Sequence, residues 1–441
     1  MFRLFKKLKK RTFYEGARRT KKNRDFWNAN APFEATAMGE RDTLRARARW
    51  LSENNAIMAN IDNSILVNVV GTGISPQLLT DDKDANNEIE RAFVDGFLNS
   101  KNADILGEQT FAELQWTMIK TRMIDGEVFI HLVNTIDGLK LQLIEADALD
   151  VTQKGHGIER DKYGKPKAYW FKELDDNGMY AGSKRVKAED VIHLFKKMRP
   201  TQGRGVSEYK QSIISIKNFS AFTDATIEGA RARASIGYVV QADGAVQHNS
   251  ITEEENEKIQ SIGNTEVYYL RPGESISKTA PGSSDTEFNN FSTIIIRLIA
   301  TARSVSYELA FKDLSKVNYA SGRAAFTQDY KLFDKEQYDL THTVLNRVFD
   351  RWLELEILSS RLKYRRFLTE AVRKAWTFPK RSLMDPLKEA HAMEKEIELN
   401  MLTQSELASR NGRDFEDIVA KKAHEQEILA KYNMQEVDNA E

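Results

Sequence analysis

The sequence predicts an α+β protein in which helices predominate. Long stretches carry apolar residues at three- and four-residue steps, which is the pattern of one buried helix face. Between residues 127 and 195, short aliphatic and aromatic runs bounded by Gly, Asp and Pro are typical of a small antiparallel sheet packed on helices. A length of 441 residues, with 41% apolar and 29% charged residues, is enough for two or three packed subdomains.

The composition restricts the classes of function. Lys plus Arg and Asp plus Glu each number 65, so a nucleic-acid role would need local clusters of cations. The absence of cysteine excludes disulfides, thiolate metal sites and cysteine nucleophiles. The chain has neither a run of eighteen apolar residues nor the apolar region of a secretory signal, so we expect a soluble protein that is not exported.

The first 24 residues form a basic arm, with eleven Lys or Arg against the single acid Glu15. Apolar residues fall on one helical side of the arm, so an amphipathic helix on a membrane surface is one interpretation. Contact with phosphates or with an acidic partner is another. A solvated arm explains the same composition, and we favour that interpretation.

Helical periodicity begins at residues 41–70, where Gly71 and Gly73 end the pattern, and it returns over about 84–98 and 111–125. The first of these stretches has an apolar stripe made of Trp50, Leu51, Ile57, Met58, Ile61 and Ile65.

A helical hairpin with a small insert is expected further along. Residues 207–237 and 288–306 are helical by period, and the insert between them, 238–287, combines short strand patterns with a charged helical pattern over 251–263. This order places the insert at the tip of the hairpin. The second helix has apolar positions at Phe288, Phe291, Ile294, Ile295, Leu298, Ile299 and Ala302.

The junction at residues 318–323 is small and polar, which predicts either a mobile loop or a helix start. A long helical run follows over 323–362. Beyond it, Asp385-Pro386 and Thr403 have the character of helix N-termini.

Motifs for catalysis or metal binding are weak. In the acidic run that starts at Asp81, Asn87 and Phe93 occupy the positions where a calcium loop needs Gly and Glu, so a helix N-terminus explains the run better. Residues 201–205 resemble half a phosphate loop but lack its Gly-Lys-Ser/Thr ending. His131 and His193 lie in expected strands without metal-ligand spacing, so we expect both to be structural. The sequence predicts no metal, no cofactor and no catalytic residue.

Seven segments, in order, resemble the lambda-like portal proteins of tailed bacteriophages and together cover about residues 41–425. The segment SYELAFKDLSKVNYASGRAA resembles the part of that family that joins a channel-lining helix to the tunnel loop. The other six are RARARWLSENNAIMANIDNSILVNVVGTGISPQ, MIKTRMIDGEVFIHL, LQLIEADAL, GIERDKYGKPKAYWF, VIHLFKKMRPTQGRGVSEY and DPLKEAHAMEKEIELNMLTQSELASRNGRDFEDI.

The resemblance implies a mainly helical portal fold, a dodecameric ring and a subunit with wing, stem, clip, tunnel loop and crown. Carried over by position, these parts follow the basic arm 1–24 as wing 25–206, stem helices 207–237 and 288–306, clip 238–287, tunnel loop 307–325, wing helix region 326–379 and crown 380–441.

The function that the resemblance implies is a DNA conduit at one capsid vertex of the virion. The ring would assemble in the host cytoplasm with major capsid and scaffold proteins, and it would dock the large terminase subunit during DNA packaging. Head–tail connector or adaptor proteins would bind later, and double-stranded DNA would leave through the channel during genome ejection.

A channel through which DNA slides cannot hold many phosphates, since each contact adds affinity. The candidate channel cations are Arg231, Arg233, Lys312, Lys316 and Arg323, and a solvated charge or an intersubunit ion pair is the alternative for each. A ring of identical subunits needs head-to-tail interfaces. We expect these at the stem helices and at the clip-strand residues Val267, Tyr268, Tyr269 and Leu270.

Two other classes of function remain as alternatives. An enzyme is disfavoured because the sequence has no P-loop, nucleophile elbow or metal-ligand spacing, and ATP hydrolysis in packaging would belong to the motor. A peripheral membrane or nucleic-acid-binding protein would act through residues 1–24. Deleting the arm distinguishes this alternative, since loss of all partner binding with an otherwise monomeric remainder would favour it.

Overall fold

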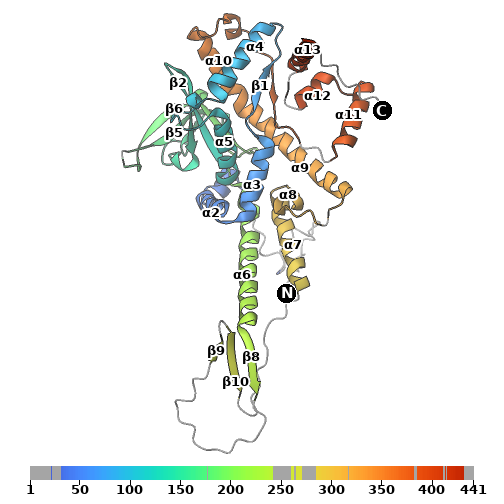
Figure 1. Cartoon of the computed structure of the whole chain (residues 1–441). Helices are drawn as coiled ribbons and strands as arrows, with labels where there is room; N and C mark the ends of the chain where they lie inside the picture. The colour runs from blue at the N-terminus through green and yellow to red at the C-terminus, as the bar shows by residue number, and fades with distance from the viewer. Residues whose placement is uncertain are drawn as a thin grey trace, which may run out of the picture.

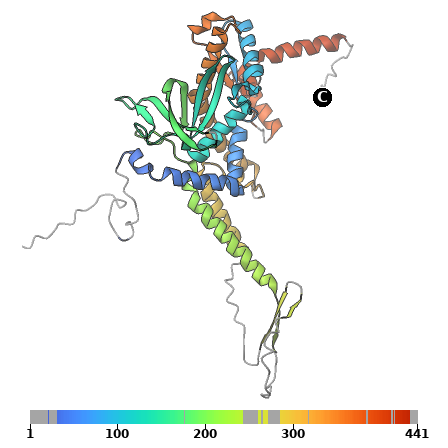
Figure 2. The ribbon, with the colours of Figure 1, turned by 90° about the vertical axis from the view of Figure 1, so that its left-hand side faces the viewer.

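The computed structural model describes residues 21, 31–175, 177–241, 260–262, 265–270, 285–315, 317–381, 385–410, 413 and 415–431. Over 232–241, 260–262, 265–270 and 285–287 the description is of the backbone. Apart from Lys21, the expected basic arm 1–24 lies outside the described residues. Figures 1 and 2 show a mixed α+β body, a pair of helices that project from it, a small sheet at the far end of that projection, and three C-terminal helices at the opposite end of the molecule.

The N-terminal part of the body is helical. Its helices are α1 (Phe33–Ala37), α2 (Arg41–Asn54), α3 (Ala56–Val69), α4 (Lys83–Phe93) and α5 (Phe111–Asp125). The prediction of a single helix over 41–70 is wrong in one respect, because extended backbone at Asn55 divides the helix into α2 and α3. The Asn55 side chain caps α3 by accepting from the Met58 amide at 3.1 Å. Trp50, expected in the buried stripe, is 61% exposed, since it lies on the side of α2 away from buried Ala48.

Two three-stranded antiparallel sheets replace the one sheet expected over 127–195. The first contains β3 (Gly138–Glu145), β2 (Glu127–Thr135) and β7 (Val191–Phe195), in that order. The second contains β4 (Ile158–Arg160), β5 (Pro166–Leu174) and β6 (Tyr180–Lys187). Phe129 joins the two, because its ring packs 5.6 Å from Tyr169 and 5.2 Å from Phe171. A separate two-stranded sheet pairs β1 (Ser75–Leu78) with β11 (Lys374–Thr377).

A long helix crosses the body as α9 (Tyr319–Leu340), the π-helical turn η8 (Thr341–Leu345) and α10 (Asn346–Leu358). The core lies where α10 meets α4 and α5. Phe93 is fully buried there and packs 5.3 Å from Phe349 and 4.9 Å from Trp352. Short helical turns connect the elements of the body, namely η2 (Val94–Leu98), η3 (Lys101–Ala103), η4 (Ala146–Ala148), η5 (Ala188–Asp190) and η9 (Arg365–Leu368).

The projection consists of α6 (Ile213–Ser235), which follows the turn η6 (Glu208–Gln211), and α7 (Asp285–Ala302). The two helices pack through aromatic rings, with Phe222 5.5 Å from Phe288 and 4.3 Å from Phe291. Ile295 and Ile299 of α7 are buried as expected, but Phe291, Ile294 and Leu298, expected on the same apolar face, are exposed. Ile214 and Ile227 of α6 are exposed as well.

The sheet at the end of the projection has β10 (Thr265–Leu270) between β8 (Ile236–Gln241), which is parallel to it, and β9 (Gln260–Ile262), which is antiparallel. The charged helix expected over 251–263 is wrong at 260–262, because this segment pairs with β10 as β9; the rest of that range lies outside the described residues.

The C-terminal helices are α11 (Pro386–Glu398), α12 (Gln404–Arg410) and α13 (Phe415–Lys431). Both expected helix starts are confirmed. Asp385 accepts from the Lys388 amide at 3.2 Å, and Thr403 and Glu406 satisfy each other's amides at 2.8 and 3.1 Å. Among the described residues, none of the helices combines the length and the apolar character of a membrane-spanning segment.

Candidate channel segment and the buried charges beneath it

A short helix, α8 (Tyr307–Phe311), leads from the projection into the segment 312–318, in which Lys312, Leu314, Ser315 and Asn318 are exposed. The Ser306 hydroxyl caps the helix by accepting from the Leu309 amide at 3.2 Å. Lys312 ends it in a left-handed conformation (φ 56°), and its amide donates to the Glu308 carbonyl at 2.8 Å. The chain therefore leaves α8 at a defined residue.

The expected junction at 318–323 is a helix start. Asn318 accepts from the Ser321 amide at 2.8 Å, while the Ser321 hydroxyl accepts from the Asn318 amide at 3.2 Å. Phe311, the last residue of α8, and Leu314, between α8 and this capping box, are about half exposed, at 46% and 56%. The segment thus has fixed ends and an exposed centre.

The candidate channel cations lie in two places. Lys312 is exposed at the start of the segment 312–318, and Arg323 is exposed in the first turns of α9. Arg231 is exposed in the last turns of α6, the helix that leads to the sheet at the far end of the projection. Lys316 lies outside the described residues. Arg233 is part of α6, but its side chain is also outside the description. The structure therefore does not bring these residues into one cluster.

The interface candidates Val267, Tyr268, Tyr269 and Leu270 all lie in β10, and each pairs with β8. Within the described part of the chain, β9 pairs with β10 at Thr265, Glu266 and Val267. The side chains of β10 are outside the description. For these four residues the structure therefore gives only the strand pairing.

Buried charges meet where the projection joins the body. The Arg303 side chain, at the end of α7, is fully buried; its Nη2 lies 3.1 Å from Asp62 of α3, its Nη1 3.6 Å from Glu208 of η6, and its guanidinium 5.1 Å above the ring of Tyr209. Burial raises the pKa of Asp62, although Arg303 and the hydrogen bond from Tyr209 act against the rise.

The same cluster continues to α9. Arg122 of α5 lies 2.7 Å from Glu336 and 3.2 Å from Glu208, and Lys196 lies 3.0 Å from Glu208 and also pairs with Glu336. Burial alone would raise the pKa of Glu208, but Arg122, Lys196 and Arg303 outweigh it and lower that pKa to about 2. We call this set the root cluster: Asp62, Arg122, Lys196, Glu208, Arg303 and Glu336.

The root cluster was not predicted from the sequence. One signal was present: Arg122 comes four residues after Met118 and one before Met123, so it lies on the buried face of its helix. The cluster has three positive and three negative side chains. Through Glu208, just before α6, and Arg303, just after α7, it links both helices of the projection, where they meet the body, to α3, α5 and α9.

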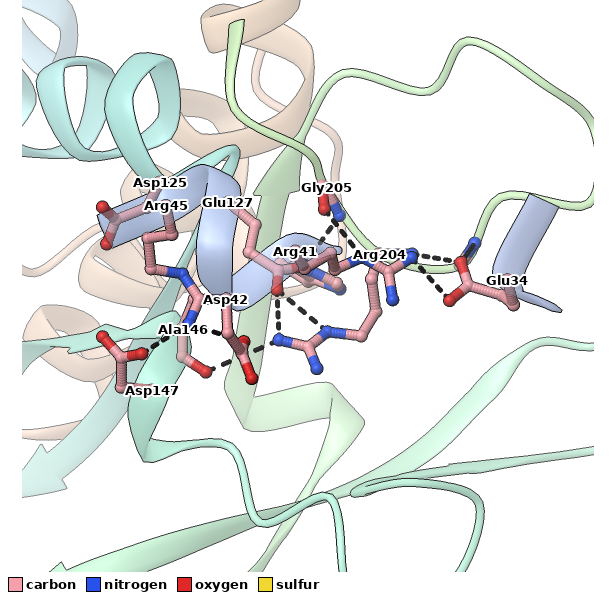
Figure 3. A network of polar contacts seen from close by, with 12 residues as sticks. Glu34, Arg41, Asp42, Arg45, Asp125, Glu127, Ala146, Asp147, Arg204 and Gly205 are labelled. Carbon is pink, nitrogen blue, oxygen red and sulfur yellow. Dashed lines mark hydrogen bonds and ion pairs between the residues drawn. The ribbon is translucent and has the colours of Figure 1, made fainter. Parts of the chain in front are cut away.

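A second polar network surrounds Glu127 at the start of β2 (Figure 3). This carboxylate is fully buried, and it accepts from the Arg204 Nε at 2.9 Å, the Gly205 amide at 2.8 Å and the His193 ring. Burial alone would raise the pKa of Glu127, but Arg204 and His193 more than offset it, so the pKa is lowered. His193 is thus held by a carboxylate in a structural role.

The N-terminal helices close this network. Glu34 of α1 accepts from the amides of Gly203 and Arg204 at 2.7 and 3.1 Å, and Arg41 of α2 donates to the Gly205 carbonyl at 3.1 Å (Figure 3). The segment that resembles half a phosphate loop therefore cradles an anion of its own chain, the Glu34 carboxylate.

A cleft of about 1050 Å³ lies between the long helix and β11. Its lining includes Arg323, Tyr330, Tyr338, His342 and Trp376. Among the described residues, no group of three or more His, Asp or Glu is arranged to hold a metal ion.

The family model for phage portal proteins of the lambda family matches residues 19–337. The chain belongs to this family. It is 26% identical over 413 residues to a probable portal protein of Halomonas phage phiHAP-1, covering 86% of this chain and 79% of that protein. It is 21% identical over 263 residues to the portal protein of Escherichia phage N15 and 20% identical to portal protein B of Escherichia phage lambda, and in both cases the match covers 53% of this chain and about half of the relative, 50% and 49%.

Among solved structures, the chain is similar to chains of gene transfer agent (GTA) particles. The neck of an empty GTA particle, computed with C6 symmetry, is 15% identical with a TM-score of 0.47, covering 85% of this chain and 94% of that chain. The neck of a native GTA particle, computed with C12 symmetry, is 14% identical with a TM-score of 0.45, covering 85% and 93%.

Two segments that resemble motifs of the portal family meet at Glu127. Gly126 has a positive φ of 94°, and a Cβ there would lie 2.3 Å from the carbonyl carbon of Val206. A Cβ at Gly205 would lie 2.0 Å from the Gly126 carbonyl oxygen. Both positions need glycine because the two backbones touch.

Proposed function

We propose that this portal-family chain forms a dodecameric ring that conducts double-stranded DNA through one vertex of a phage or phage-like capsid. One observation carries the proposal most directly: in a chain that matches the family over residues 19–337, α7 runs along α6 toward the body and leads into α8 and the segment 312–318. In this proposal the segment faces the channel.

The parts of the subunit follow from this assignment. The projection supplies the stem helices, within 207–237 and 288–306, and 238–287 at its far end is the clip. Residues 307–325 are the tunnel loop. The wing comprises 25–206 and 326–379, and 380–441 form the crown. The order body, projection, terminal sheet in Figures 1 and 2 supports this division.

Exposed apolar residues on the projection support a ring. Phe291, Ile294 and Leu298 are 43%, 56% and 56% exposed and lie on one face of α7 by their spacing. A stripe of this kind is usually covered by a partner. In a head-to-tail ring the neighbouring stem would cover it, and β10 with Val267, Tyr268, Tyr269 and Leu270 would lie at the neighbouring clip.

The role proposed is structural and not enzymatic. Sequence neutrality, 65 basic against 65 acidic residues, suits a passage in which DNA slides, with local contacts from Arg231, Arg233, Lys312, Lys316 and Arg323. The energy of packaging would come from the large terminase subunit docked on the ring. Further proposed partners are the major capsid and scaffold proteins, during assembly in the host cytoplasm, and later the head–tail connector proteins.

Native mass spectrometry of the full-length chain tests the ring. We expect a mass of twelve chains for the wild type and for the control Asn290→Asp, because Asn290 is an exposed polar residue of the same helix. Ile294→Asp places a charge within the apolar stripe, and we expect it to yield subunits that no longer form rings. A wild-type chain that stays monomeric at high concentration, even with its scaffold, would contradict the proposal.

A further inference from the structure

Helix α8 cannot hold its own position. It has five residues, far fewer than the roughly 12–15 below which an isolated helix is marginal in water. Leu309 and Ala310 are buried, at 9% and 1% exposure, but the residues that follow are exposed. Contacts from other elements must therefore decide where α8 lies and where the chain beyond it begins.

The C-terminal end of α8 is held by Asn60 of α3. The Asn60 Nδ2 donates to the carbonyl oxygens of Leu309 and Ala310, both at 2.9 Å. Carbonyls in the last turn of a helix have no partner within the helix, so this amide satisfies two of them. Asn60 is two residues from Asp62, which holds Arg303 at the end of α7. One helix, α3, thus fixes both the end of α7 and the end of α8.

The N-terminal end of α8 is held by Asp329 of α9. Its Oδ1 accepts from the Ser306 amide at 2.8 Å and its Oδ2 accepts from the Ser306 hydroxyl at 2.6 Å. Asp329 is 2% exposed, so this contact is sheltered from water. Because Ser306 in turn caps α8 through the Leu309 amide, Asp329 sets the orientation of the first turn.

We propose that Asn60 and Asp329 are positioning residues that set where the segment 312–318 projects. The inference rests on the proposed function, in which this segment faces the channel. Neither residue needs to touch DNA. They act through α8. The segment begins at Lys312, whose amide donates to the Glu308 carbonyl of α8, and it ends at Asn318, which caps α9.

The chain offers a matched pair of substitutions for α3. Asn60→Asp keeps the size of the side chain, removes the amide donor and turns a carboxylate toward two carbonyl oxygens at the negative end of a helix. Asn68→Asp is the same change on the same helix, where the Asn68 Nδ2 donates to Ser64 of its own helix at 2.8 Å and makes no contact with α8 that the structure describes.

A second pair separates hydrogen bonding from bulk at Asp329. Asp329→Asn retains an acceptor for the Ser306 amide and can donate to the Ser306 hydroxyl, which is free to rotate. Asp329→Ala removes both hydrogen bonds. A positioning role through Ser306 therefore predicts rescue by Asn and impaired positioning with Ala.

Hydrogen exchange measured by mass spectrometry on the full-length chain tests the inference. In Asn60→Asp and in Asp329→Ala we expect the amides of Ala310 and Lys312, whose acceptors are the Ser306 and Glu308 carbonyls, to exchange about tenfold faster, equivalent to ~1.4 kcal/mol, as loss of a hydrogen bond predicts. Wild-type rates are expected in Asn68→Asp and Asp329→Asn. Unchanged exchange in Asn60→Asp would overturn the inference, as would faster exchange spread evenly over α3 and α9.

Electron cryomicroscopy of assembled rings then distinguishes the two proposals. We expect Asn60→Asp to form intact rings in which 312–318 no longer occupies one position, and wild-type and Asn68→Asp rings to share one position. If the wild type formed no rings, the proposed function would be wrong, while the exchange result would still decide how α8 is held.

Discussion

Arginine has contrasting environments in the body and along the proposed channel. In the body, Arg122, Arg204 and Arg303 are each less than a tenth exposed and each contact a carboxylate. Arg231 and Arg323 are exposed, and within the described residues neither forms an ion pair. The comparison shows that the same residue type is held by carboxylates where it is buried in the body, whereas these two exposed arginines have no such partner among the described residues.

The physical reason is the cost of removing a charge from water. A buried guanidinium must have a nearby carboxylate, and losing one partner leaves the other charge unpaired in the protein interior. An exposed cation is solvated and screened, so its removal hardly changes the folded state. The two regions should therefore respond very differently to the same substitution.

The largest expected effect is at the root cluster. Arg122→Met leaves Glu208 and Glu336 with too few cations, and we expect it to lower the free energy of unfolding by about 3–5 kcal/mol. Urea denaturation measures this. Arg185→Met is the control, since the Arg185 side chain is 45% exposed and pairs with Glu159 at 2.8 Å on the surface; it should lower the free energy of unfolding far less than Arg122→Met does. An equal loss of stability in the two variants would contradict the difference between buried and exposed arginines.

Two glycines with positive φ allow the same comparison between a packed and an open position, here for the backbone. Gly126→Ala would place a Cβ 2.3 Å from Val206, whereas at Gly182 (φ 81°) nothing lies within 4 Å. We expect Gly182→Ala to cost about 1–2 kcal/mol from conformation alone. Gly126→Ala should cost about 1–3 kcal/mol more, because packed backbone must move. Thermal unfolding of both variants measures the difference, and identical melting temperatures would contradict the close approach.

The pH dependence of stability tests whether the Glu208 carboxylate stabilises the fold through its cation partners. Its pKa is lowered from 4.5 to about 2 in the folded protein, so the stabilisation it gives is present above pH 4.5 and is lost as the pH falls from 4.5 toward 2. Glu208→Gln should be less stable than the wild type at pH 7, by about 1–3 kcal/mol, and the gap should narrow toward pH 2.5. Urea midpoints at both pH values test this, and a gap that stays constant would exclude the mechanism.

The smallest expected effect on stability is at the exposed cations. Arg231→Ala and Lys312→Ala should change the free energy of unfolding by less than about 0.5 kcal/mol. Their effect should appear instead in the salt dependence of DNA binding by the ring, because the slope becomes shallower when fewer phosphates are neutralised. A large drop in folding stability, or an unchanged salt slope in both variants, would place these residues outside the channel surface.

Much of the fold was predictable because it depends on local pattern. Apolar periodicity located α6 and α7, and the dipeptide Asp385-Pro386 and the run from Thr403 to Glu406 located helix starts. The division of the sheet region into two sheets was missed, since strand pairing depends on contacts between residues far apart in sequence. The exposure of Phe291, Ile294 and Leu298 was missed for a related reason: apolar spacing does not say whether the cover comes from the same chain or from another.

The candidate site was less predictable. The sequence offered Lys312 and Arg323 as candidate channel cations, but it could not show that they are exposed while Arg122 and Arg303, which also carry a positive charge, are buried. The sequence carries no signal for Asn60 either, because its two hydrogen bonds join residues that are 249 and 250 positions apart in the chain.

Negative-stain electron microscopy of the purified full-length chain tests the central claim most directly. The account predicts closed rings of twelve subunits around a central hole wide enough for duplex DNA, with the α6–α7 projections gathered around the axis. A uniform population of monomers or dimers at high concentration, which scaffold or other assembly partners cannot convert into rings, would contradict it.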